Sequence, residues 1–232
     1  MNPARRLLTA LIGPRATAEI TRCVRNLQHE FRLRHQHRRG EVRAAELAAR
    51  GPVRLHLGCG EVYKAGWVNV DAYHAPPCTP DLLLDLRRPL PFPDGSCTEV
   101  YSEHFFEHLP YPDGARALLC ETIRVLASDG RASIGVPDPQ PVLAAYLAGT
   151  SEPYFDYFSH HPSVTRHLGT KMEAVNWLFR QGGEHHFIYD FPSLELLLRE
   201  AGFRRVVRRD FDPARDSEPR RHGTLYVDAW KS

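Results

Sequence analysis

The sequence lacks several features that would place it in a specialised class of proteins. No apolar run approaches the roughly 20 residues that a membrane-spanning helix needs. The five cysteines are odd in number and never spaced C-x-x-C, which argues against a disulfide framework or a zinc knuckle and favours reduced thiols in a cytoplasmic protein. The apolar stretch after Arg6 stops at Pro14, so we expect no signal peptide. A net charge of +2 gives no argument for a nucleic-acid partner.

What remains is typical of a globular protein. The 232 residues are 42% hydrophobic and 25% charged, enough for one α/β domain with a core. Residues 1–50 differ, because they are rich in arginine, predicted to be helical, and end at Gly51-Pro52. We interpret them as a basic helical N-terminal arm. The arm is either a solvated helix packed on the domain, the reading we favour, or a lid or contact for an anionic partner.

Residues 51–232 are predicted to form the main domain. Short apolar runs that end in turn or acidic residues predict buried strands at 53–57, 67–70, 82–84, 97–102 and 132–136. A helical pattern that begins at Asp113 separates the last two. This alternation predicts a mostly parallel sheet covered on both faces, with ligands at the carboxyl ends of the strands.

Residues 140–190 are rich in aromatic side chains and histidine, and they predict a helical insertion, or lid, over the active site. A helix is expected through Met172, Val175 and Phe179, ended by Gly182-Gly183. His160, His161 and the aromatic residues between Tyr146 and Phe158 could line a substrate pocket or, at least as readily, fill the core of the insertion. A short helix at 193–201 and strands at 203–209 and 224–230 complete the chain.

Glycines and carboxylates follow the first three predicted strands. Gly58-Cys59-Gly60 lets the backbone approach a ligand closely, because glycine has no Cβ. Asp71 can accept hydrogen bonds from both hydroxyls of a ribose, and Asp85 can accept one from an adenine amine. Leu86 and Leu90 are expected on the faces of that adenine.

These motifs together resemble class I S-adenosylmethionine (SAM)-dependent methyltransferases. Residues 55–60 (LHLGCG) resemble motif I of that family, and residues 66–71 (GWVNVD) resemble the GWINVD of a small bacterial subgroup. Residues 90–96 resemble LPFxDxS, and residues 102–108 resemble SxHxxEH. Further similarity, including RVL at 124–126, extends the resemblance over about residues 53–230.

The resemblance implies a Rossmann-like α/β fold, with a mostly parallel sheet, an antiparallel last strand and a helical insertion. It implies SAM as the cofactor and S-adenosylhomocysteine (SAH) as the product. The cofactor-binding residues that it implies are Leu57, Gly58, Cys59, Gly60, Asp71, Asp85, Leu86, Ser102 and Glu103.

One departure from the family concerns the first crossover. Only residues 61–66 separate Gly60 from Trp67, whereas a parallel crossover usually needs about a dozen residues or more. We therefore expect the helix after motif I to be missing, shortened or replaced. The binding loop would then be more open, and Asp71 would carry more of the affinity for the cofactor.

The resemblance also implies in-line transfer of a methyl group to a nucleophile, which needs a base if the acceptor is an alcohol. The candidate catalytic residues are His104, His108 and His185, with Glu107 placed to orient His108. Residues 104–108 also match the H-x-x-E-H zinc-protease pattern. A strand precedes the pattern and Pro110 follows it closely, so we expect no metal.

The leading hypothesis is an O-methyltransferase that acts on a small molecule or a glycan. The alternatives are an RNA methyltransferase that uses the basic arm, and a SAM-binding protein without methyl transfer. No Arg-Gly repeat or added RNA-binding module supports the RNA alternative, so we expect no nucleic-acid partner. We expect no membrane span and a cytoplasmic location, and the oligomeric state stays open.

Overall fold

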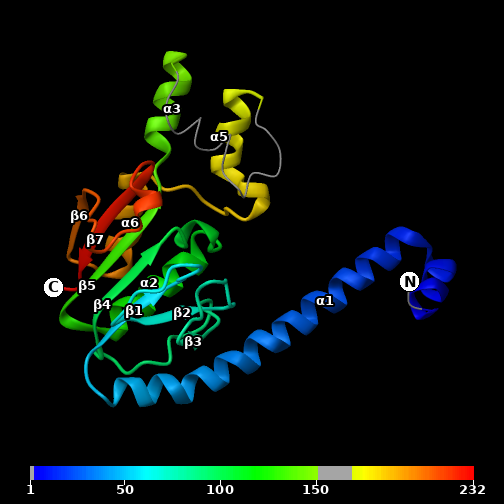
Figure 1. Ribbon diagram of the computed structural model, residues 1–232, viewed down its shortest axis with the longest axis horizontal. Helices are drawn as coiled ribbons and strands as arrows, with labels where there is room; N and C mark the ends of the chain where they lie inside the picture. Colours follow the sequence, from blue (N-terminus) through cyan, green and yellow to red (C-terminus); the bar gives the residue numbers. More distant parts are fainter. Residues whose placement is uncertain (1–2, 151–168) are drawn as a thin grey trace.

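The computed structural model describes residues 3–150 and 169–232, which build a seven-stranded sheet flanked by helices (Figure 1). The sheet order is β3-β2-β1-β4-β5-β7-β6. Strands β1 to β5 are parallel, and β7 is antiparallel to both β5 and β6. This confirms the predicted Rossmann-like sheet with an antiparallel last strand. The bounds are β1 Val53–Leu57, β2 Val68–Asp71, β3 Leu82–Leu83, β4 Cys97–Glu103, β5 Leu126–Pro137, β6 Arg205–Arg209 and β7 Thr224–Trp230.

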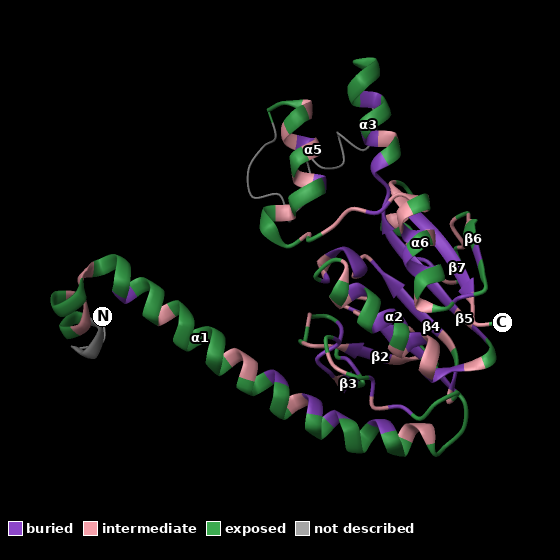
Figure 2. Ribbon diagram, turned by 180° about the vertical axis from the view of Figure 1, so that it is seen from behind, coloured by how far each residue is buried: buried purple, intermediate pink, exposed green. Residues whose placement is uncertain are grey.

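One face of the sheet is apolar. Helices α2 (Asp113–Val125) and α6 (Phe191–Ala201) lie side by side on it, and their apolar residues recur at helical spacing. Figure 2 shows the buried strands behind these two helices. The core contains alternate residues of the strands, which include Leu55, Leu57, Val70, Val100, Ile134 and Val227.

The opposite face of the sheet is polar, and this differs from the prediction. It carries buried side chains that can donate or accept hydrogen bonds, among them His56, Asn69, Tyr101, Ser133 and Asp228. Among the described residues, contacts to this face come from the segments 58–67 and 210–223 rather than from α-helices; the second segment contains the short 3-10 helix η3 (Glu218–Arg220). The short first crossover explains the difference, since no helix lies between β1 and β2.

Helix α1 (Pro3–Ala48) runs along the β3 edge of the sheet and extends beyond it (Figure 1). It breaks at Gly13, whose φ of 81° is non-helical, immediately before Pro14. Near its other end, Gly40 lies so close to β3 that a Cβ there would meet Leu84 at 2.4 Å. Within the described part of the chain, no helix combines the length and apolar character needed to cross a membrane.

Two helices of the predicted insertion lie at the end of the sheet where β5 leaves it (Figure 1). Helix α3 (Pro139–Ala148) is capped by Asp138, and α5 (Lys171–Arg180) begins with a capping box of Thr170 and Glu173. They pack through Val142, Ala145, Ala174 and Leu178. The short 3-10 helix η2 (Gln181–Gly183) follows. The remaining candidates for the pocket, including Tyr154, Phe155, Tyr157, Phe158, His160 and His161, lie outside the described residues.

Some element boundaries differ from the predicted ones. Strand β5 starts directly after α2 at Leu126, six residues before the predicted start at 132. Strand β6 starts at Arg205 instead of 203. Helix α6 starts at Phe191 instead of 193, and the side chain of Asp190 caps it. None of these differences changes the strand order.

We expect His56 to make stability depend on pH. Burial lowers its pKa from 6.5 to about 4 in the folded chain, where the ring is hydrogen-bonded to Asn69 at 3.0 Å. The unfolded chain therefore binds an extra proton as the pH falls from 6.5 toward 4, and this costs up to about 3 kcal/mol of stability. Urea denaturation should show a smaller loss over this window in His56→Gln. His222→Gln, at an exposed position, is the control, and equal slopes in both variants would contradict this role.

Candidate functional site at the carboxyl ends of the strands

The turn after β1 is held against β2. The N–H groups of Gly58 and Cys59 both donate to the carbonyl of Val70, at 2.9 and 3.1 Å. Gly58 has a φ of 66°, and a Cβ there would lie 2.4 Å from the ring of Phe105. Glycine is therefore required at position 58 both by its backbone conformation and by the close approach of Phe105.

Asp71 closes this turn from the end of β2. Its Oδ2 accepts a hydrogen bond from the Gly60 N–H at 2.9 Å, and its Oδ1 accepts one from the Tyr73 N–H at 3.2 Å. The carboxylate is only partly buried and lines a pocket of about 230 Å³. Two backbone donors fix its orientation while it remains accessible from the pocket.

The pocket is formed by three parts of the chain. The segments after β2 and β3 contribute Asp71, Ala72, Tyr73, Asp85, Leu86 and Arg87. The segment after β4 contributes Phe105, His108, Leu109 and Pro110, and helix α1 contributes His29 and Leu33. The structure thus brings Asp71, Asp85, Leu86 and His108 together, four of the residues singled out in the sequence.

Asp85 is held by a residue that the sequence analysis missed. Burial alone would raise the pKa of this carboxyl, but hydrogen bonds from the Arg87 side chain and backbone lower it below its usual value. Arg87 Nε lies 2.8 Å from Asp85 Oδ1, and its Nη2 also donates to Glu30 of α1 at 3.0 Å. Arg87 therefore ties the pocket to the N-terminal helix.

Helix α1 closes one side of the pocket, which the resemblance gave no reason to expect. The rings of His29 and Tyr73 stack with centroids 5.6 Å apart, and Tyr73 Oη lies 2.7 Å from His29 Nε2. His29, Glu30 and Leu33 are spaced i, i+1 and i+4, which puts them on one side of a helix. The spacing could have predicted that these three residues share one side of the helix. The sequence does not show which part of the fold that side packs against.

Five other residues singled out in the sequence keep their side chains out of this pocket. Leu57 is fully buried in the core, and the Cys59 thiol lies 3.9 Å from that of Cys78. Ser102 is buried, and its hydroxyl has no hydrogen-bond partner. Glu103 is directed to the opposite side of β4. Leu90, expected beside Leu86, packs in the core.

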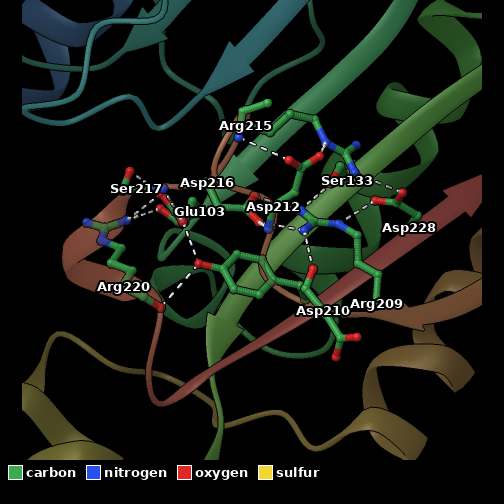
Figure 3. A network of polar contacts seen from close by, with 12 residues as sticks. Glu103, Ser133, Arg209, Asp210, Asp212, Arg215, Asp216, Ser217, Arg220 and Asp228 are labelled. Atoms are coloured by element: carbon green, nitrogen blue, oxygen red, sulfur yellow. Dashed lines mark hydrogen bonds and ion pairs between the residues drawn. The ribbon is translucent and has the colours of Figure 1, made fainter.

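Glu103 belongs to a polar network that fastens the loop 210–223 onto the sheet (Figure 3). Its carboxylate accepts from the Ser217 hydroxyl at 2.6 Å and from the Tyr226 hydroxyl at 2.9 Å. At the other end of the network, the guanidinium of Arg209 makes a bidentate pair with Asp216, at 2.6 and 2.7 Å. Arg209 also donates to Asp228 and to Ser133.

The three candidate catalytic histidines lie around Glu107. The short 3-10 helix η1 (Phe106–His108) places Glu107 and His108 beside His104, and the chain returns from the insertion with His185. His104 Nδ1 and His108 Nε2 lie 3.8 and 3.9 Å from Glu107 Oε1. The rings of His108 and His185 meet edge to face, with centroids 4.9 Å apart.

Burial controls the charges in this cluster. It raises the pKa of Glu107 to about 8 and lowers the pKa of His185 to about 4. The pKa values of His104 and His108 are also lowered by burial. All three imidazoles are therefore neutral at pH 7 and can accept a proton or bind a cation through a free nitrogen. His104 has a φ of 55°, a strained conformation that is concentrated at functional sites.

The chain has low similarity to known proteins. No protein-family model matches it. No curated protein shows significant similarity to it. Among solved structures, a SAM-dependent methyltransferase from Thermotoga maritima, described as a possible histamine N-methyltransferase, is 15% identical, with 91% of this chain and 97% of that chain covered and a TM-score of 0.42.

Two further structures are similar at the same level. A SAM-dependent methyltransferase from Archaeoglobus fulgidus is 15% identical, with 83% of this chain and 94% of that chain covered and a TM-score of 0.46. Phosphoethanolamine N-methyltransferase 2 of Haemonchus contortus, in complex with SAM, is 13% identical, with 78% and 49% covered and a TM-score of 0.44.

Replacing Arg209 should destabilise the fold strongly. The Arg209 side chain is 12% exposed and that of Asp216 is fully buried, so Arg209→Met leaves a buried carboxylate without its counter-charge. We expect a loss of about 3–5 kcal/mol in the free energy of unfolding, measured by urea denaturation. Arg204→Met, at an exposed position five residues before Arg209, should change little. Similar losses in both variants would contradict the role of the ion pair.

Proposed function

We propose that the chain is a class I SAM-dependent methyltransferase. The observation that carries the proposal is the convergence of the Gly58–Gly60 turn, Asp71 and Asp85 on one edge of a Rossmann-like sheet, with both carboxylates lining a single pocket. Ligands of open α/β sheets bind at the carboxyl ends of the strands, where these residues lie. Carboxylates at strand ends are the usual acceptors for ribose hydroxyls.

The residues of the pocket suit an adenosine. Asp71 is oriented by two backbone N–H groups and keeps lone pairs for the ribose hydroxyls. Leu86 of the strand-end segment and Leu33 of α1 offer apolar contact for the purine. Arg87 donates to both oxygens of Asp85, which would accept from the exocyclic amine through a remaining lone pair. Bound SAM supplies a methyl group that is activated by its sulfonium.

Acceptor deprotonation is assigned, in this proposal, to the cluster of His104, His108 and His185, in which His104 is the residue that stays available as a base if His108 and His185 bind a metal ion. His108 lines the pocket itself, so the cluster adjoins the proposed cofactor site. Neutral imidazoles can accept a proton from a hydroxyl, which fits an O-methyltransferase for a small molecule or glycan. Burial lowers the pKa values of His104 and His108 and so weakens them as bases in the empty site. We further propose that the insertion with α3 and α5 bounds the acceptor site, since it joins β5 at the same edge of the sheet.

The proposal predicts that the chain binds SAM and SAH, as isothermal titration would measure. Asp71→Ala and Asp71→Asn should lower the affinity for SAH by roughly 3 kcal/mol, on the order of 100-fold, because two charge-assisted hydrogen bonds to the ribose are lost. Asp129→Ala, an exposed carboxylate on β5, is the control and should bind normally. If the chain binds neither SAM nor SAH, the cofactor assignment is wrong. If Asp71→Ala binds SAH with normal affinity, Asp71 does not contact the ribose.

Helix α1 should contribute to cofactor affinity. Leu33 is 4% exposed and lines the pocket, so Leu33→Ala should lower the affinity for SAM about tenfold through lost apolar contact. Phe31→Ala is the matched control, because Phe31 is 67% exposed. Thermal denaturation of both variants checks that the fold persists. Equal affinities in the two variants would show that α1 takes no part in binding.

A further inference from the structure

The site beside the pocket has an unusual composition. Glu107, His108 and His185 each offer a ligand atom, and these atoms all lie within 4.8 Å of one another. Glu107 is 0% exposed, and neither of its carboxylate oxygens has a hydrogen-bond partner. A buried carboxylate without partners is costly, so it calls for a counter-ion or a proton.

The two histidines are already oriented as metal ligands. His108 Nδ1 lies 3.1 Å from the carbonyl oxygen of Glu184, and His185 Nδ1 lies 2.6 Å from that of Leu178. Since a carbonyl can only accept, each Nδ1 carries the proton and each Nε2 keeps a free lone pair. Metal-binding histidines are typically held in this way, with the outer nitrogen donating to a carbonyl or a carboxylate.

The backbone fixes the two segments against each other. The Glu107 carbonyl accepts from the N–H groups of His186 and Phe187, at 2.7 and 3.3 Å. These bonds join η1 to the segment that carries His185, although the two are far apart in the sequence. The three side chains are therefore positioned together by the fold and do not depend on a flexible loop.

We propose that Glu107, His108 and His185 form a binding site for one divalent transition-metal ion, with Zn²⁺ as the best match. Two imidazoles and one carboxylate are a donor set that such ions use, and they leave at least one coordination position open. Ligand atoms around a tetrahedral Zn²⁺ lie roughly 3.3 Å apart. His108 Nε2 and Glu107 Oε1 are 3.9 Å apart, so small side-chain rotations complete the site.

This site differs from the zinc pattern that the sequence suggested and that we set aside. In H-x-x-E-H the two histidines of the motif would bind the metal, whereas here His104 Nε2 lies 2.9 Å from the Thr224 hydroxyl. The third ligand, His185, comes from the other side of the insertion. His104 is left at the margin, with its Nδ1 3.8 Å from Glu107.

The ion would lie next to the pocket because His108 lines that pocket. This consequence, unlike the metal site itself, rests on the proposed function. An acceptor oxygen in the open position would lose its proton more easily, since a bound cation stabilises the oxyanion. A hydroxylated acceptor is the substrate class that would gain from it.

The test is a titration of the chelator-treated full chain with Zn²⁺, monitored by isothermal titration calorimetry. Elemental analysis after dialysis then gives the number of bound Zn²⁺ ions per chain. We expect one tight site per chain and a higher Tm with Zn²⁺. Glu107→Gln, His108→Asn and His185→Asn should each weaken binding at least about 100-fold and abolish the Tm shift. His186→Asn is the matched control, because its side chain is exposed and lies next to His185 in sequence. Circular dichroism checks the fold of each variant.

Two results would overturn the inference. One is absence of stoichiometric Zn²⁺ binding, which would leave Glu107 as a protonated buried acid. The other is binding that survives all three substitutions but is lost when Cys23 and Cys120, the exposed thiols, or His160 and His161 are replaced. SAM titration of the same samples separates the two proposals. Loss of Zn²⁺ binding alone contradicts the metal site, and absence of SAM binding alone contradicts the methyltransferase.

Discussion

The bidentate ion pair between Arg209 and Asp216 holds together a face of the sheet on which no α-helix packs in the described part of the chain. In this sheet α2 and α6 bury one face, and the first crossover is too short to supply a helix for the other. This face carries polar side chains that bond to one another and to the backbone of the covering segments, as Asn69 does with Lys64. All five N–H groups of Arg209 have acceptors, on Asp216, Asp228, Ser133 and the Asp210 carbonyl. The position of Glu103, and therefore of the chain entering His104, depends on this network.

The parts of the fold set by local patterns were predictable from the sequence. Alternation of apolar residues gave the strands, and glycine and aspartate at the strand ends gave the turn and the carboxylate that meet at Gly60 and Asp71. The polar second face was not anticipated, because its alternate residues look like the solvent side of a strand until loops cover them. Helix α1 was predicted as a helix, but its packing against the pocket was not. That packing depends on long-range contacts, such as Glu30 with Arg87, for which local periodicity gives no signal.

The histidine cluster was partly predictable for a different reason. Sequence position alone placed His104 and His108 at the end of β4, and the motif containing His185 suggested a return to the same site. The pairing inside the cluster could not be predicted, because it depends on which nitrogen each ring commits to a carbonyl. His104 Nε2 is hydrogen-bonded to the hydroxyl of Thr224 on β7, so this nitrogen does not face Glu107. Burial then sets the protonation states, and burial is a property of the assembled fold.

Electrostatics connects the pocket with the ligand that we propose for it. Its lining contains two carboxylates, Asp71 and Asp85, and one guanidinium, Arg87, which leaves an excess of one negative charge. SAM carries one net positive charge, whereas SAH is neutral once the sulfonium has lost its methyl group. Because Arg87 is shared with Glu30 of α1, the guanidinium does not fully neutralise Asp85. While the neighbouring metal site is empty, the pocket would therefore attract the reactant more strongly than the product, and helix α1, through Glu30, would help to set that difference.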